Sequence, residues 1–257
     1  MLFLTDSLSD LDGVGRYAMR LIAAMERLRP GLEVHVLLAR KHRPTSKDVP
    51  AHWRVEVGLP PDYFYYMSPL RSRASQLQSV WRTWRAARGA DLVHAIKDYP
   101  HSMVALQGAR LAGIPCVATG HGTYTVQPLL SPRHRAAARR TYAGIAAMIS
   151  VSGYTAGRLR ELLADEAIPR RLAVVPNAVA AERYLEPRDV GHRPWHDVPF
   201  TLSIGELKER KGHHVWLEAF CELAPRFPEL HHFLVGRGSD DAYHRSLRAR
   251  IEAAGLG

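Results

Sequence analysis

The sequence predicts an α/β fold built on parallel sheets, and three observations lead to this prediction. Short apolar runs of strand length alternate with amphipathic segments along the chain, as in repeated βα units. Glycine-containing turns follow several of these runs, at the points where strands would end. With 257 residues, 46% of them apolar and 23% charged, the chain can bury one large core or two smaller ones.

The first part of the chain is expected to form one complete domain, residues 1–180. Tyr17, Leu21 and Met25 recur at helical spacing, and Pro30 ends that helix. The strands expected here are residues 2–4, 34–38, 53–57, 91–94, 116–119, 148–151 and 172–175. The expected helices cover about residues 17–28, 71–88, 102–112, 132–147 and 152–163, the last with Ser152 as its N-cap.

Residues 181–199 are rich in proline and glycine and poor in apolar residues, which is typical of a linker between domains. A second domain is expected at 200–257, with strands at 200–204 and 232–235 and a last helix at 242–254. Two βα units leave the faces and edges of a parallel sheet uncovered. We therefore expect these residues to be only the beginning of a domain, whose remainder is missing or comes from another chain.

Positive charge is concentrated in the first part of the chain. The net charge is +10, but residues 1–180 hold 24 Lys and Arg against 13 Asp and Glu, whereas residues 181–257 hold 11 against 12. Such an excess indicates an anionic partner, such as a membrane surface, a phosphorylated lipid or nucleic acid. A general preference for arginine in the source genome would give the same excess without a partner. No helix-turn-helix or RNA-binding signature is found, so nucleic acid is not expected.

The sequence predicts a cytoplasmic protein. No apolar run approaches the roughly 18 residues that span a bilayer, and the start of the chain lacks the basic and apolar regions of a signal peptide. The two cysteines, Cys116 and Cys221, lie far apart and match no metal-ligand spacing. We expect no bound metal and no cofactor.

One stretch, Thr201 to Phe220, has the pattern of an anion site. An apolar strand is followed by a turn at Gly205, a charged loop, Lys211 and an amphipathic helix. The free N–H groups and the positive end of a helix dipole would face this turn, and the lysine adds a full positive charge. A plain βα turn with a solvated lysine is the alternative interpretation.

Two further glycine turns follow predicted strands, Gly13/Gly15 and Gly236/Gly238. Ligands of open α/β sheets bind at the carboxyl ends of the strands, so glycine turns from two sheets facing a shared cleft indicate a nucleotide-linked ligand. His121 lies between two glycines just after a buried strand. A histidine there can donate a hydrogen bond or take a proton near neutral pH, although most histidines are ordinary surface residues.

Several of these segments, taken in order, resemble the retaining glycosyltransferases of the GT-B fold, in the GT4 group. Gly205-Glu206-Leu207 followed by Lys211-Gly212 resembles the opening of that family's second domain. The other matching segments are Gly13-Val14-Gly15-Arg16, Thr119-Gly120-His121-Gly122, Val174-Val175-Pro176-Asn177 and Leu234-Val235-Gly236-Arg237-Gly238. The chain departs from the pattern at Glu206, where the family has an arginine, and at Ala178, where it usually has a glycine. The family's glutamate pair would lie beyond Gly257.

The resemblance implies a Rossmann-like N-terminal domain on the acceptor side and the beginning of a second Rossmann-like, nucleotide-sugar-binding domain. It implies transfer of a hexose from a nucleotide-diphosphate sugar to an acceptor hydroxyl, in cell-surface glycan or glycolipid synthesis. In the family the lysine holds the donor diphosphate, a role that falls to Lys211, and His121 would contact the donor sugar. The expected donor-binding glycines are Gly13, Gly15, Gly205, Gly236 and Gly238.

The acceptor is expected to be a sugar or a lipid-linked compound, with Arg16, Arg133 and Arg135 as candidate contacts. Peripheral contact with an anionic membrane is expected at its inner face. The 257-residue chain alone is expected to have little or no activity, because the family's glutamates are absent from it. The alternative is a degenerate, non-catalytic transferase that binds anionic membranes or a partner protein.

Overall fold

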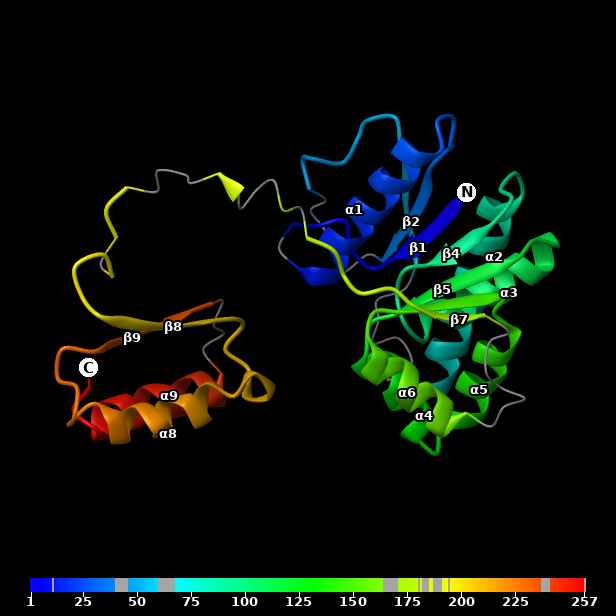
Figure 1. The fold of residues 1–257 in the computed structure, drawn as a ribbon. Coiled ribbons are helices and arrows are strands. Elements are labelled where there is room, and N and C mark those ends of the chain that lie inside the picture. Colours follow the sequence, from blue (N-terminus) through cyan, green and yellow to red (C-terminus); the bar gives the residue numbers. More distant parts are fainter. Residues whose placement is uncertain are drawn as a thin grey trace. The chain divides into compact units, whose positions relative to one another are not determined.

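The computed structural model describes residues 1–10, 12–39, 46–59, 68–163, 171–179, 181, 185–186, 191–193, 195–236 and 241–256. These residues belong to two compact units, Met1–Val179 and Ala180–Gly257 (Figure 1). The division falls one residue before the predicted end of the first domain, and it assigns the predicted linker to the second unit. Part of that linker lies outside the described residues.

A parallel sheet of seven strands forms the centre of the first unit, as the alternating pattern predicted. The strands are β1 (Leu2–Thr5), β2 (His35–Ala39), β3 (Arg54–Leu59), β4 (Val93–Ala95), β5 (Cys116–Gly120), β6 (Ala147–Ser150) and β7 (Leu172–Val174). Their order is β3-β2-β1-β4-β5-β6-β7. The strand order reverses between β1 and β4, and in doubly wound sheets this point, at the carboxyl edge, is where ligands bind.

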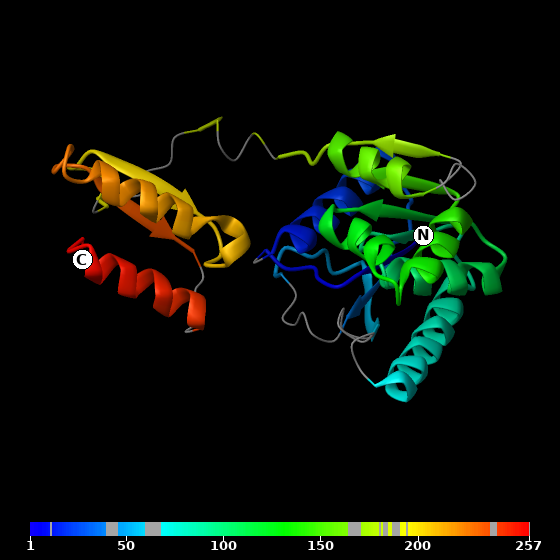
Figure 2. The same ribbon diagram turned by 90° about the horizontal axis from the view of Figure 1, so that it is seen from below.

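Helices cover both faces of this sheet. They are α1 (Gly13–Leu28), α2 (Pro69–Ala87), α3 (His101–Ala112), α4 (Thr123–Leu130), α5 (Arg135–Gly144) and α6 (Gly153–Leu162). Successive side chains of β1 point to opposite faces of the sheet and so belong to two different cores. Phe3 packs with α1, while Leu2 and Leu4 belong to the core that α3 also lines. The helix α2, teal in Figure 2, lies at the periphery of the unit.

The predicted helix 132–147 is shorter in the structure. It is also preceded by a second helix, α4, that the sequence pattern did not reveal. α5 ends at Gly144, and Ala147 already belongs to β6. A Cβ at Gly144 would lie 2.2 Å from the Arg110 guanidinium, so the end of the Arg110 side chain packs directly on this glycine. The extra helix, α4, is short and contains Pro128, which hides its periodicity.

The second unit holds two parallel strands, β8 (Phe200–Ile204) and β9 (His231–Val235). Its helices are α8 (His213–Leu223) and α9 (Ala242–Ala253), which pack against each other, and a 3-10 turn, η3 (Glu209–Lys211), precedes α8. Leu202 and Ile204 on β8 are 44% and 75% exposed. The expectation that two βα units leave apolar strand side chains uncovered is thus confirmed for β8.

None of the helices in the described ranges combines the length and the apolar character that crossing a membrane requires.

Candidate functional site

The carboxyl edge of the first sheet gathers buried polar side chains at the point where the strand order reverses. Lys97, two residues after β4, makes an ion pair of 2.7 Å with Asp6, the residue after β1. Their side chains are only 10% and 4% exposed. The Lys97 ammonium also lies 5.5 Å from the centroid of the Tyr124 ring. A buried pair of this kind fixes the two loops relative to each other, because separating its charges there would leave one unpaired.

His121 lies at this edge, directly after β5. Its backbone N–H donates to Asp98 Oδ1 at 2.9 Å, and its Nε2 lies 2.7 Å from the carbonyl oxygen of Ile96. A carbonyl only accepts, so Nε2 carries the proton and Nδ1 has a free lone pair in the neutral ring. The edge of the Tyr17 ring packs against the imidazole, with 4.8 Å between the centroids. The ring is therefore held on two sides in one orientation.

The chain around His121 is shaped by glycine and threonine. Gly122 has φ +104°, in the region that favours glycine, and precedes α4. A Cβ at Gly120 would lie 2.8 Å from Thr125 Oγ1. That hydroxyl donates to Asp98 Oδ1, the same oxygen that accepts from the His121 N–H. Asp98 thus positions both His121 and the first turn of α4.

The glycine turn at Gly13 and Gly15 serves packing as well as any ligand. A Cβ at Gly15 would lie 2.5 Å from the backbone of Ser9, so only glycine allows this close approach. The Gly15 N–H donates to the Asp12 carboxylate at 2.7 Å, which caps α1. The Asp12 carboxylate therefore occupies the place that a bound anion would take at this helix terminus. At Gly13, by contrast, nothing lies within 4 Å of a Cβ, so packing does not require a glycine there.

His94 on β4 lies in the same region and predicts a pH dependence of stability. Burial, with a smaller contribution from His121, lowers the pKa of His94 from 6.5 to about 4. Between these two pH values the unfolded chain binds a proton that the folded chain does not, so the free energy of unfolding should rise with pH from 4 to 6.5. The full effect is on the order of 3 kcal/mol.

His94→Gln should remove this contribution, because glutamine does not titrate and can still reach Thr119 Oγ1, which lies 2.9 Å from His94 Nε2. Urea unfolding of both proteins at several pH values measures the difference. Parallel profiles for the two proteins between pH 4 and 6.5 would show that His94 is not held neutral by burial.

In the second unit, Lys211 lies where the sequence pattern placed it. It ends η3, one residue before Gly212, which has φ +73° and is the N-cap of α8. The aliphatic stem of Lys211 passes over the turn after β8: a Cβ at Gly205 would lie 3.8 Å from its Cδ. The ammonium group is thus carried at the carboxyl edge of the small sheet, beside the start of a helix, where an anion is favoured.

Glu206 stands where the resemblance leads one to expect an arginine, and its charge is compensated locally. Its carboxylate lies 2.8 Å from the Lys208 ammonium and 4.0 Å from the Arg210 guanidinium. The hydrogen bond from Lys208, followed by the charges of Lys208, Arg210 and Lys211, lowers the pKa of Glu206. Because these cations offset it, Glu206 opposes an anion at Lys211 less than an unpaired carboxylate would.

Gly236, at the end of β9, touches the turn at Gly205 directly. A Cβ at position 236 would lie 1.7 Å from the Gly205 carbonyl oxygen, a distance that no side chain can occupy. The two glycine turns of this unit are therefore in contact through their backbones. Gly238 and Arg237, from the same predicted turn, lie outside the described residues.

Gly236→Ala should destabilise the second unit by about 2 kcal/mol or more, because the backbone at Gly205 must move to admit the methyl group. Gly157→Ala is the matched control: nothing lies within 4 Å of a Cβ there, and the helical position favours alanine. Thermal unfolding followed by circular dichroism compares the two variants. Equal melting temperatures for Gly236→Ala and the wild type would contradict this packing.

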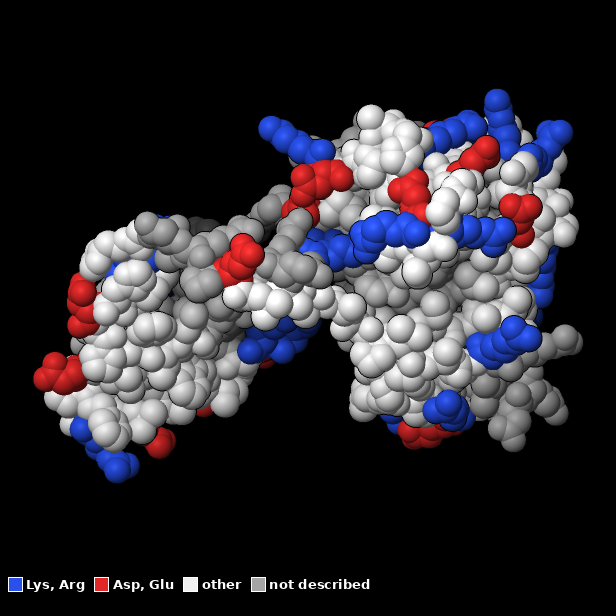
Figure 3. Space-filling view, turned by 45° about the horizontal axis from the view of Figure 1, so that its top comes forward, with Lys and Arg blue, Asp and Glu red and all other residues white. Residues whose placement is uncertain are grey.

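The predicted acceptor arginines have different surroundings. Arg16 is exposed on the first turns of α1, and Arg133 precedes α5 and lines a groove that α2 and α3 also line. Arg135 donates from Nε to the Leu129 carbonyl at 3.0 Å and is not among the residues that line the groove. Figure 3 shows Lys and Arg side chains spread over one face of the first unit, with Asp and Glu side chains interspersed among them.

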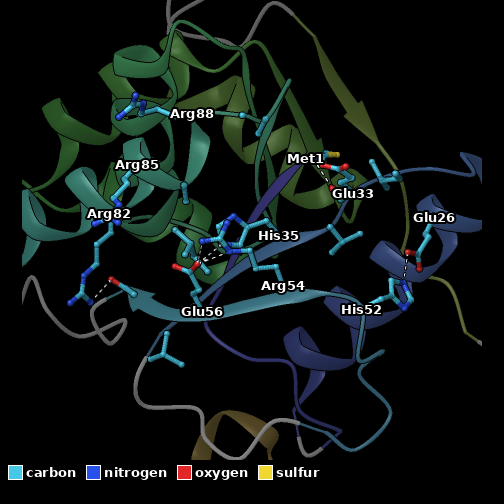
Figure 4. Close-up of a pocket in the computed structure, with 18 of the residues that line it drawn as sticks. Met1, Glu26, Glu33, His35, His52, Arg54, Glu56, Arg82, Arg85 and Arg88 are labelled. Atoms are coloured by element: carbon cyan, nitrogen blue, oxygen red, sulfur yellow. Dashed lines mark hydrogen bonds and ion pairs between the residues drawn. The ribbon is translucent and has the colours of Figure 1, made fainter.

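A pocket of about 1050 Å³ lies at the opposite, amino edge of the sheet (Figure 4). Charged groups of both signs line it, and several of them pair with one another. Glu56 lies close to the Arg54 guanidinium and 3.3 Å from His35 Nε2, and His52 Nε2 lies 2.6 Å from Glu26. In Figure 4, Arg82 reaches across to a backbone carbonyl, that of Gly58, at 3.2 Å. This pocket therefore has no concentrated charge of one sign to select a ligand.

Across the described ranges, no group of three or more His, Cys, Asp or Glu side chains is arranged to hold a metal ion. The residues that sequence reasoning missed are Asp98, which positions His121, and the Asp6–Lys97 pair. Both lie just after predicted strands. Charged residues at that place in a parallel sheet are the signal that could have identified them.

The family model of Glycosyltransferase Family 4 matches residues 11–183. Among solved structures, Anabaena HepE in complex with UDP and glucose is similar with a TM-score of 0.69 and 20% identity, covering 99% of this chain and 66% of that one. The lipopolysaccharide outer core galactosyltransferase WaaB is similar with a TM-score of 0.63 and 14% identity, over 99% and 65% of the two chains.

Sucrose-phosphate synthase from Thermosynechococcus elongatus is similar with a TM-score of 0.65 and 16% identity, covering 100% of this chain and 68% of that one. At these identities the likeness establishes the GT-B fold alone. The chain thus spans about two thirds of the length of these proteins. A comparison with curated proteins finds no match.

Proposed function

Because the chain belongs to Glycosyltransferase Family 4, whose model matches residues 11–183, we propose that it transfers a hexose from a nucleotide-diphosphate sugar to an acceptor hydroxyl, with retention of the anomeric configuration. Anabaena HepE has been solved in complex with UDP and glucose and with UDP-glucose, which supports a nucleotide-sugar donor. Synthesis of cell-surface glycans or glycolipids in the cytoplasm is part of the same proposal.

The observation that supports this function most strongly is the fixed orientation of His121. Its Nε2–H is committed to the Ile96 carbonyl, and within the described residues no hydrogen bond engages Nδ1. We assign Nδ1 to a hydroxyl group of the donor sugar. Such a contact costs no reorganisation at the moment of reaction, because the ring is already held by Ile96 and Tyr17.

We assign the donor diphosphate to Lys211. When the bond between the anomeric carbon and the phosphate oxygen breaks, negative charge grows on the departing diphosphate. An ammonium group beside a helix start stabilises this charge in the transition state more than in the ground state. The glycines at 205 and 236 keep the backbone at this edge free of side chains, as a closely bound phosphate requires.

The acceptor hydroxyl forms the new bond to the anomeric carbon, and its proton leaves with the diphosphate. Arg16 and Arg133 are our candidates for holding this acceptor. Arg135 is a weaker candidate than the sequence suggested, because its guanidinium is engaged by the Leu129 carbonyl.

The surface of α2 supports peripheral contact with an anionic membrane, as part of this function or of a second, non-catalytic one. Leu70, Leu77 and Trp81 are 80%, 71% and 50% exposed and recur at i, i+7 and i+11, so they form one apolar stripe. Arg85 stacks on Trp81 at 5.5 Å, which places positive charge beside that stripe. A basic helix with such a stripe can lie in the interface of a bilayer.

Incubation of the protein, as expressed from its gene, with UDP-glucose, UDP-galactose and GDP-mannose tests the proposed transfer. We expect release of the nucleoside diphosphate with one donor, and NMR of the product should show the same anomeric configuration as the donor. An inverted product would contradict retention. If no donor reacts while anionic vesicles bind, the non-catalytic function is favoured.

A further inference from the structure

A groove of about 670 Å³ runs between three helices of the first unit, and among the described residues its charged lining is of one sign. α3 lies in the middle, with α2 packed on one side and α5 on the other. Four arginines line it: Arg73 from α2, Arg110 from α3, and Arg133 and Arg140 from the segment that includes α5. No Asp or Glu is among the described residues that line it.

These arginines have no carboxylate partner in the parts of the chain that the structure describes. None of them makes an ion pair there, in contrast to the amino-edge pocket, where Arg54 pairs with Glu56. A cleft lined by one sign of charge focuses its field and raises the local concentration of the opposite ion. Four guanidinium groups brought together without counter-charges repel one another, and a bound anion would relieve that repulsion.

The floor of the groove consists of buried, well-packed side chains. Tyr99, Met103 and Leu106 are 5%, 8% and 5% exposed, so the base is packed and apolar. Gln76 of α2 donates to Gln107 Oε1 of α3 at 3.3 Å, which ties one wall to the floor. A site of this kind, with charged groups on rigid helices above a packed base, can hold a ligand in one position.

The groove reaches the carboxyl edge of the sheet. Tyr99 lines it and follows directly after Asp98, whose carboxylate accepts the His121 N–H at 2.9 Å. His134 also lines the groove, and the centroids of the Tyr99 and His134 rings are 6.0 Å apart. The end of the groove is therefore connected through a single peptide to the loop that positions His121.

From these observations we propose that the groove binds a phosphate ester through Arg73, Arg110, Arg133 and Arg140, and that this phosphate belongs to the acceptor. The assignment of the phosphate to the acceptor rests on the proposed transfer function, whereas phosphate binding in the groove does not. Guanidinium groups match phosphate oxygens with paired hydrogen bonds, and several of them favour a group with more than one charge over a carboxylate. The phosphate could be that of a soluble sugar phosphate or of a lipid headgroup.

Titration of the purified chain tests this proposal with two probes: glucose 6-phosphate, and vesicles of phosphatidylcholine with and without phosphatidylglycerol. We expect saturable binding of one probe. The double variant Arg133→Gln/Arg140→Gln should lower its affinity by at least about tenfold, since two charge-assisted contacts are lost. Binding of glucose 6-phosphate identifies a soluble ligand, and binding of only the anionic vesicles identifies a lipid.

The control is Arg27→Gln/Arg160→Gln, which removes the same charge from exposed helix positions outside the groove. Its affinity should stay within about twofold of the wild type. Equal losses in the two double variants, or no binding of either probe, would overturn the groove as a phosphate site. The nucleotide that the wild type binds, UDP or GDP, should bind equally well to both double variants. Absence of binding of both nucleotides to the wild type would overturn the proposed transfer, whereas the groove assignment would still depend only on the two phosphate probes.

Discussion

His121→Ala is expected to lower kcat/KM for hexose transfer by more than about tenfold. The substitution removes the ring that the Ile96 carbonyl and Tyr17 hold in place, and with it the Nδ1 atom that we assign to the donor sugar. A preorganised polar contact at the reacting centre contributes this much or more to a transition state. Initial rates at several donor concentrations separate an effect on kcat from one on KM.

Two further variants sharpen this prediction. His121→Asn keeps a polar atom near the position of Nδ1 but cannot take a proton, so it distinguishes hydrogen bonding from proton transfer. His52→Ala removes an exposed histidine from the amino edge and should leave the rate unchanged. A kcat/KM within about twofold of the wild type for His121→Ala would show that this residue does not contact the reacting sugar.

Lys211→Ala should also lower transfer by more than about tenfold, and here we expect the donor affinity to fall together with kcat. The ammonium group is exposed beside Gly205, and its pairing with a diphosphate would be lost. The loss should be larger at low ionic strength, because screening weakens the contact. Transfer rates and donor KM at two salt concentrations provide this measurement.

Arg248→Ala serves as the matched control for Lys211→Ala. Arg248 is an exposed cation on α9 of the same unit, so its removal changes the net charge equally without touching the turn after β8. Equal rates for the two variants would mean that Lys211 acts only through the overall charge of the unit.

The sheet and most of the helices could be predicted from the sequence because their signals are local. A run such as residues 2–4 is buried on both faces, so its apolar character alone reveals a strand. Ser152 was predicted as an N-cap, and its Oγ indeed accepts from the Thr155 N–H at 3.1 Å. α4 was missed because it is one short element containing a proline, and η3 because three residues leave no periodicity.

The candidate site was predicted only in part, since its organisation depends on contacts between distant residues. The turn at Gly205 and the position of Lys211 followed from one continuous stretch. The hydrogen bond between Asp98 and His121 joins residues that follow two neighbouring strands, β4 and β5, and no local pattern reveals it. The arginine groove likewise needs three helices packed together, so the sequence showed only a general excess of charge. The cap that Asp12 provides at the start of α1 also became visible only in the structure.

The most direct test of the central claim, that this chain contributes to a nucleotide-sugar site, is isothermal titration of the protein as expressed from its gene with UDP and with GDP, in the wild type and in Lys211→Ala. The account predicts micromolar binding of one nucleotide by the wild type and its loss in the variant. Absence of binding for both nucleotides would contradict it.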